Sequence, residues 1–164
     1  MSTTTTRETV EVPQRLDLGK HAASAYRAML GLEQAVRDLG LEHSLLELVK
    51  IRASQINGCA YCLDMHTKDA EALGETHQRM HALNAWRETP FFTARERAAL
   101  ALTEAITLVA EDGVEDEVWE AAAEHFDASE LAALTWAVAV INTWNRVAIT
   151  TRQTPGQYRP KTAR

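Results

Sequence analysis

The sequence predicts an all-α protein, a helical bundle of about six to seven helices, and two observations carry this prediction. Apolar residues recur at steps of three and four, the period of a helix, along nearly all of the chain after residue 15. No stretch keeps the period-two alternation of a half-buried strand. At 164 residues the chain suits one domain with its own core. We therefore expect a flexible N-terminal segment over 1–15, a single helical domain over 16–150 and a basic C-terminal tail over 151–164.

The first two helices are predicted from their apolar stripes and from the turn signals that follow them. Between residues 18 and 39 the apolar positions alternate steps of four and three, which keeps them on one face of a long helix that ends at Gly40. A second helix is expected over about 42–56, because the Asn-Gly pair at 57–58 is a strong turn signal.

The next two helices are bounded by a glycine and a proline. A third helix is expected to open at residue 59 and to continue to 73, where Gly74 offers a C-terminal cap. A fourth helix is predicted over 75–88, before Pro90.

In the last third of the chain, a threonine or an aspartate twice precedes a glutamate by three residues, which is the signature of a capping box. These pairs, at 93/96 and 127/130, predict helices over about 94–110 and 128–150, with a shorter helix over about 115–125 between them. The last helix is apolar almost all round, so we expect it to be covered on every side.

Charge and composition exclude several classes of partner. With 17 basic and 23 acidic side chains the chain has a formal charge of -6, which opposes broad attraction to nucleic acid or anionic lipid. The longest apolar run, 131–141, is far shorter than the roughly 18 residues of a membrane span. The first residues lack the apolar run of a secretory signal. We expect a cytoplasmic protein with reduced thiols, no nucleic-acid or membrane partner, and a solvated tail.

The segment NGCAYCLDMH, residues 57–66, holds both cysteines of the chain. At about 100° per residue, Cys59, Cys62 and His66 project within an arc of about 60° on one helix face. A helix N-terminus stabilises a thiolate, and cysteines three residues apart are close enough to form a disulfide. His66 follows Cys62 by one turn and is placed to exchange a proton with its sulfur. Glu47, on the preceding helix, is the candidate carboxylate that holds this histidine.

Other interpretations of the pair remain open at this point. Two neighbouring cysteines can be silent core residues. The two cysteines, the histidine and the glutamate can also be counted as four zinc ligands, although structural zinc sites generally draw a second pair from elsewhere and the chain has no second CxxC. A thioredoxin fold needs strands that are not predicted. His77 and His81, four residues apart, are expected to be solvated surface residues rather than a metal pair.

The spacing of Glu47, Cys59, Cys62 and His66, with HTKDA immediately after it, resembles the motif of the AhpD-like alkylhydroperoxidases of the carboxymuconolactone decarboxylase superfamily. The strongest resemblance covers residues 44–75. It implies an all-α fold, a homo-oligomer that is a trimer or a hexamer, and a thiol-dependent peroxidase that uses no bound metal or cofactor.

The resemblance also implies roles for these residues. Cys62 would attack a small hydroperoxide and become a sulfenic acid, and Cys59 would resolve it to a disulfide. An external dithiol reductant, a dithiol reductase or a lipoylated protein, would then reduce the disulfide, with Cys59 as the outer thiol that meets it, while Glu47 and His66 relay the proton. Thioredoxin-style reasoning would instead name the first cysteine as the nucleophile, since it is usually the more exposed.

Tyr61 departs from the family pattern, because well-studied peroxidase members have a second histidine between the two cysteines. A phenol with an ordinary pKa near 10 does not shuttle protons at neutral pH as imidazole does, although it can donate a hydrogen bond. Two alternative functions follow: a redox-sensing or interaction protein with a slow dithiol switch, and a carboxymuconolactone decarboxylase-like enzyme. Members of the decarboxylase branch typically lack the cysteine pair.

Overall fold

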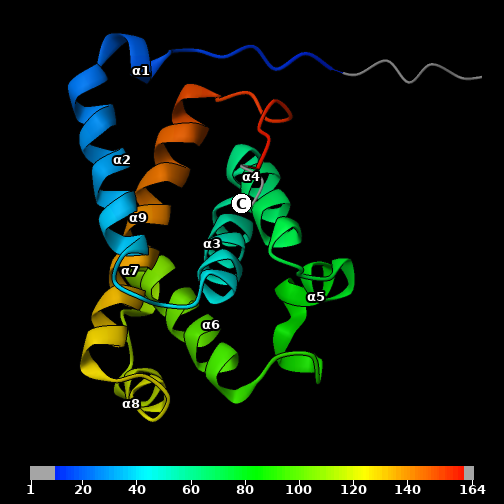
Figure 1. Ribbon diagram of the computed structural model, residues 1–164, viewed down its shortest axis with the longest axis vertical. Helices are drawn as coiled ribbons and strands as arrows, with labels where there is room; N and C mark the ends of the chain where they lie inside the picture. Colours follow the sequence, from blue (N-terminus) through cyan, green and yellow to red (C-terminus); the bar gives the residue numbers. More distant parts are fainter. Residues whose placement is uncertain (1–9, 161–164) are drawn as a thin grey trace, which may run out of the picture.

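The computed structural model describes residues 10–160, and this part of the chain contains helices and irregular segments but no strand (Figure 1). The all-α prediction is therefore confirmed. Of the predicted flexible segment and the predicted basic tail, residues 1–9 and 161–164 lie outside the described residues. The elements are α1 (Leu18–His21), α2 (Ala23–Arg37), α3 (His43–Asn57), α4 (Ala60–Ala72), α5 (His77–Ala82), the 3-10 helix η1 (Leu83–Glu88), α6 (Ala94–Thr107), α7 (Val109–Asp112), α8 (Asp116–Ala123) and α9 (Ala128–Thr151).

Three predicted helices are each divided in two. Ala22 (φ -138°, ψ 47°) separates α1 from α2, and Leu108 (φ -99°, ψ 21°) separates α6 from α7. Neither break has a glycine or a proline to announce it. The predicted helix over 75–88 becomes α5 and η1, with an irregular residue at Ala85. There the Arg97 guanidinium donates to the backbone carbonyl of Trp86, a tertiary bond that sequence periodicity does not show.

Helix ends that carry side-chain signals were predicted correctly. Both capping boxes are formed, by Thr93 with Glu96 and by Asp127 with Glu130. Gly58 ends α3 in the left-handed region, at φ 69° and ψ 35°, which a residue with a Cβ rarely adopts.

Helix α3 lies at the centre of the bundle. Every residue from Leu45 to Ile51 is buried, because α4, α6 and α9 cover it on different sides. In Figure 1, α3 lies between α9 and α4, and α2 runs along α9. A polar residue in this stretch is therefore taken out of water and must find its partners inside the protein.

The prediction that the last helix is covered on every side is wrong for the single chain. One stripe of α9 is exposed, and its largest member, Trp136, has 52% of its surface accessible. The stripe consists of Ala132, Trp136, Ala139, Thr143 and Arg146. Between residues 10 and 160 no helix, α9 included, is both long and apolar enough to cross a membrane.

The basic tail was expected to be solvated, but its described part packs against α4. The Gly156 N–H donates to Asp64 Oδ2 at 2.9 Å, and the Tyr158 hydroxyl donates to Asp69 Oδ1 at 2.7 Å. Lys68 Nζ donates to the Tyr158 carbonyl at 3.3 Å.

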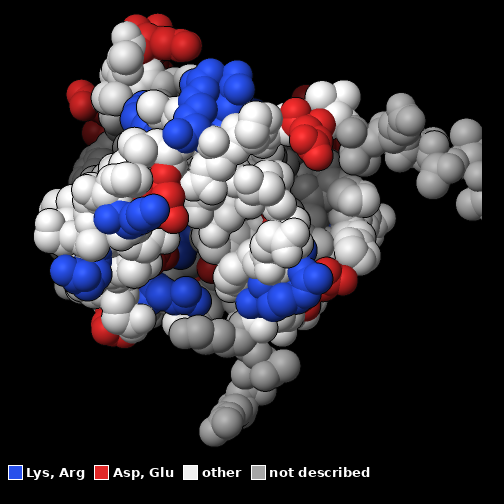
Figure 2. All heavy atoms as spheres, turned by 90° about the horizontal axis from the view of Figure 1, so that it is seen from above, with Lys and Arg blue, Asp and Glu red and all other residues white. Residues whose placement is uncertain are grey.

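Seen from above, Lys and Arg side chains are spread around a largely uncharged surface (Figure 2).

Candidate functional site

The turn between α3 and α4 places both cysteines at a helix N-terminus. The chain reverses at Gly58, and Cys59 (φ -86°, ψ 99°) is the N-cap of α4 rather than its first residue. The Cys59 Sγ accepts the backbone N–H of Cys62 at 3.4 Å. The cysteine side chain therefore takes the capping role that a serine or an aspartate usually has.

Both sulfurs are more deeply buried than expected. Cys59 and Cys62 each expose 1% of their surface, and they pack with Ala53, Ile141 and Ala148. The expectation that Cys59 is an outer, exposed thiol is wrong for the single chain, because the end of α9 covers it.

The two thiols have opposite pKa shifts. Hydrogen bonding from the Cys62 thiol lowers the pKa of Cys59 to about 7, and the N–H groups of Cys62 and Tyr61 add to this against the effect of burial. The Cys59 sulfur in turn raises the pKa of Cys62, and burial raises it further. The pair therefore begins to lose its first proton near neutral pH, and these shifts favour the negative charge on Cys59, with the Cys62 thiol donating to it.

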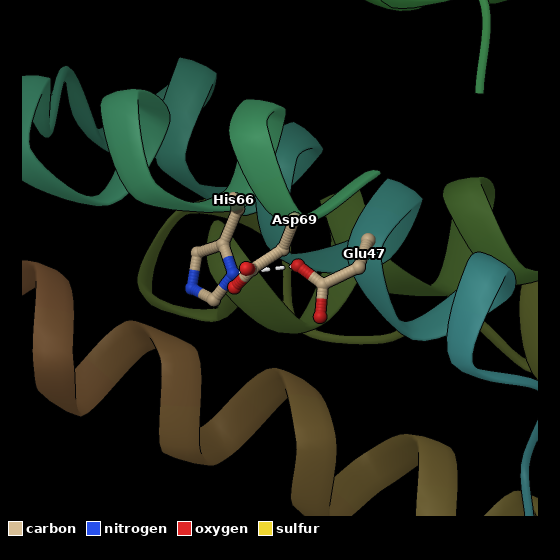
Figure 3. A group of neighbouring side chains, drawn as sticks. All are labelled: Glu47, His66 and Asp69. Carbon is tan, nitrogen blue, oxygen red and sulfur yellow. Dashed lines mark hydrogen bonds and ion pairs between the residues drawn. The ribbon is translucent and has the colours of Figure 1, made fainter. Parts of the chain in front are cut away.

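Glu47 and His66 form the contact that the sequence predicted. His66 Nδ1 lies 2.7 Å from Glu47 Oε2, and Glu47 exposes 1% of its surface. Burial raises the pKa of Glu47, but the hydrogen bond and the charge of His66, with the charge of Lys50, lower it by more. An ionised Glu47 fixes the ring of His66 and leaves Nε2 on the side away from it (Figure 3). Among the described residues, His66 makes no hydrogen bond to either thiol.

Lys50 is a member of this site that the sequence analysis missed. Its side chain is 2% exposed, and its Nζ lies 2.5 Å from Glu33 Oε1 and 3.8 Å from Glu47 Oε1. It thus joins α2 to α3 beside the buried carboxylate. The available signal was a lysine one turn after Glu47, within a stretch of α3 whose other buried residues from Leu45 to Ile51 are apolar.

Asp69 was also missed, although it stands in the HTKDA segment. The ligand atoms of Glu47, His66 and Asp69 all lie within 4.8 Å of one another, and Figure 3 shows the three side chains meeting between α3 and α4. The carboxylates of this group already have hydrogen-bond partners, however. Glu47 accepts from His66, and Asp69 accepts from Tyr158, while Lys50 places a positive charge 3.8 Å from Glu47 Oε1.

The arrangement that would make the motif a zinc site is not formed within residues 10–160. The two sulfurs do not join Glu47 and His66 in any group whose ligand atoms all lie within 4.8 Å. His77 and His81 form no such group in this part of the chain either, and His77 is largely exposed.

A buried polar network lies beneath the thiols, and its centre is Asn145 of α9. The Asn145 amide donates to Ser54 Oγ at 3.0 Å and accepts from Asn57 Nδ2 at 2.9 Å. Both Asn145 and Ser54 are completely buried. Hydrogen bonding by Asn145 lowers the pKa of both cysteines. This network fixes the α3–α4 turn to α9.

The two cysteines open onto different cavities. The first cavity has a volume of about 170 Å³, the second about 240 Å³. Tyr61, Ala148 and Gln153 line both and stand between them. The first is lined by Tyr26, Leu30, Glu33, Arg37, Tyr61, Cys62, Met65, His66, Trp144, Ala148 and Gln153. The second is lined by Val12, Gly58, Cys59, Ala60, Tyr61, Ala148, Ile149, Arg152, Gln153 and Pro155.

Tyr61 is partly buried between the two cavities. Burial raises its pKa above the ordinary value, and the nearby Tyr26 and Cys62 add to the shift. The phenol therefore stays protonated at neutral pH. It can act as a wall or a hydrogen-bond donor.

Comparisons with known proteins agree with this fold. The model of the Carboxymuconolactone decarboxylase family matches residues 23–105. The uncharacterized protein YdfG of Bacillus subtilis (strain 168) is 40% identical over 136 residues, which cover 83% of this chain and 92% of YdfG.

Two solved structures are also similar. A protein of unknown function from Agrobacterium tumefaciens, described as a candidate antioxidant defence protein AhpD, has a TM-score of 0.86 and 39% identity, over 89% of this chain and all of that one. An uncharacterized peroxidase-related protein with an alkylhydroperoxidase AhpD core, from Ralstonia eutropha JMP134, has a TM-score of 0.75. It covers 85% of this chain and 74% of its own, and at 21% identity it shows a common fold.

Proposed function

The chain is an AhpD-like member of the carboxymuconolactone decarboxylase family, and from this premise we propose that it is a thiol-dependent peroxidase that reduces small hydroperoxides. The observation that carries the proposal is the placement of Cys62 and His66 on one cavity, with Glu47 bonded behind the histidine. A nucleophile, a proton carrier and a group that orients it are thereby held together.

The proposed cycle assigns peroxide attack to Cys62. The lowered pKa favours Cys59 as the nucleophile, but position favours Cys62, because Cys62 shares a cavity with His66 while Cys59 faces the other cavity. The Cys59 thiolate already accepts the hydrogen bond of the Cys62 thiol and can take its proton as the attack begins. In this way Cys59 serves first as a base.

The atoms of the cycle balance as follows. The Cys62 sulfur attacks the outer peroxide oxygen, the O–O bond breaks, and the alkoxide leaves as an alcohol after it takes up a proton, for which His66 is the nearest relay. Cys62 is then a sulfenic acid. Cys59 then gives up the proton that it took and attacks the Cys62 sulfur, the S–O bond of the sulfenic acid breaks, the departing hydroxide takes up that proton and leaves as water, and a disulfide forms. An external dithiol, from a dithiol reductase or a lipoylated protein, restores both thiols by exchange. No metal or cofactor enters this cycle.

The test is a thiol count on the freshly reduced protein before and after one equivalent of cumene hydroperoxide, with peroxide loss followed in parallel. We expect two thiols to be lost for each peroxide. Cys62→Ser should consume none, whereas Cys59→Ser should stop after one turnover with a sulfenic acid that dimedone traps on Cys62. The reverse pattern would exchange the two roles. Two intact thiols beside untouched peroxide would remove the peroxidase assignment.

A slow dithiol switch is the second candidate, and the burial of both sulfurs favours it, since a reductant must reach a thiol with 1% exposure. Rate separates the two functions. An enzyme should reach a kcat/KM of roughly 10⁴ M⁻¹s⁻¹ or more with a suitable dithiol, and a sensor need not.

A further inference from the structure

The cavity that Cys62 shares with His66 has an apolar wall and a charged wall. Much of its wall is apolar, and an edge-to-face pair of Tyr26 and Trp144, with ring centroids 5.5 Å apart, forms part of it. Its volume, about 170 Å³, is comparable to cavities of about 150 Å³ that hold one benzene ring. A ligand that fits this cavity has a small apolar part, about the size of one benzene ring.

Helix α2 brings charge to the same cavity. Leu30, Glu33 and Arg37 line it at steps of three and four, so they lie on one face of the helix. The acid of this set is already occupied, because Glu33 is paired with the buried Lys50 at 2.5 Å.

Arg37 has no such partner among the residues that the structure describes. Arg52, Arg79, Arg87 and Arg95 each form an ion pair with a glutamate, whereas no ion pair or side-chain hydrogen bond of Arg37 is formed within residues 10–160. Its positive charge acts on the buried Glu47, which His66 already engages, and helps to lower the pKa of that carboxyl.

A guanidinium that lines a small cavity with its donors free is suited to a carboxylate, which it can bind through two parallel hydrogen bonds. We propose that the substrate is a hydroperoxide with a compact apolar body and a carboxylate group, and that Arg37 binds this carboxylate. This inference rests on the proposed function. The carboxylate is unchanged by the reaction, in which the two thiols are oxidised and the hydroperoxide becomes an alcohol and water.

The test compares two substrates that differ in one group: cumene hydroperoxide and its 4-carboxylate. With the full chain and dihydrolipoamide as reductant, we expect the carboxylate to have the lower KM. Arg37→Met should raise the KM of the carboxylate by about 10- to 100-fold and change that of cumene hydroperoxide by less than about 3-fold. Arg37→Lys should recover part of the loss. Arg27→Met, an exposed arginine of the same helix that does not line the cavity, is the matched control.

Binding of 4-isopropylbenzoate, which carries no peroxide, separates this inference from the peroxidase assignment. We expect calorimetry to show binding to the wild type that Arg37→Met weakens by a similar factor. If benzoate binding depends on Arg37 but the protein reduces neither hydroperoxide, the carboxylate-binding role of Arg37 stands and the peroxidase assignment fails. Equal KM values for the two hydroperoxides in the wild type, equal losses for both in Arg37→Met, or no Arg37-dependent binding of the benzoate would overturn the inference.

Discussion

Replacing Lys50 with methionine is expected to reveal how much the buried ion pair stabilises the bundle. The substitution keeps the length of the stem and removes a charge that is 2% exposed, 2.5 Å from Glu33 and 3.8 Å from Glu47. Removing one partner of a buried ion pair typically costs about 3–5 kcal/mol. Glu33 is 20% exposed and regains water, and Glu47 keeps His66, so we expect the lower end, about 3 kcal/mol.

The assay is urea unfolding of the reduced protein at neutral pH, read as a shift of the midpoint at constant slope. At this chain length each kcal/mol moves Tm by about 2–4 °C, so the loss corresponds to about 6–12 °C. Lys68→Met is the control, since Lys68 forms a more exposed pair with Asp64 at 2.8 Å and should lose no more than about 1 kcal/mol. The double variant Glu33→Gln/Lys50→Met should recover part of the stability. A Lys50→Met loss equal to that of the control would refute this account.

Four further outcomes are expected. Thiolate absorbance of the reduced protein should show one step with a midpoint of about pH 7, and Cys59→Ser should abolish it. The pKa of Cys59 in the folded protein is below the ordinary thiol value of about 8.5, so ionisation of Cys59 stabilises the fold. This stabilisation should be complete above about pH 8.5 and should be lost as the pH falls through about 7. Gly58→Ala should lower the free energy of unfolding in urea by about 1–2 kcal/mol through its positive φ alone, since no atom lies within 4 Å of the added Cβ. Gly31→Ala, inside α2, should instead raise it. Effects of the same sign would contradict this. Trp136→Glu should reduce the molar mass measured by light scattering if the exposed stripe of α9 joins subunits, and an unchanged mass would place the interface elsewhere.

The helices could be predicted wherever a local signal exists. The two capping boxes and Gly58 act through bonds within a few residues, so their positions follow from the sequence. The breaks at Ala22 and Leu108 carry no glycine or proline. Local propensity cannot anticipate such breaks.

The candidate site divides in the same way. The contact of Glu47 with His66 follows from a motif whose turn brings two consecutive helices together. Lys50 and Asp69 lie next to this motif, but their roles depend on Glu33 and Tyr158, which come from helix α2 and from the C-terminal tail. Those distant contacts become visible only in the folded chain.

The placement of the two sulfurs on separate cavities has a consequence for kinetics. A hydroperoxide that enters beside Cys62 and a dithiol that reaches Cys59 would approach the pair from different directions, with Tyr61 and Gln153 between them. Neither reactant would occupy the path of the other. An enzyme built in this way should show the parallel double-reciprocal lines of a ping-pong reaction without the inhibition by excess peroxide that a single shared entrance produces.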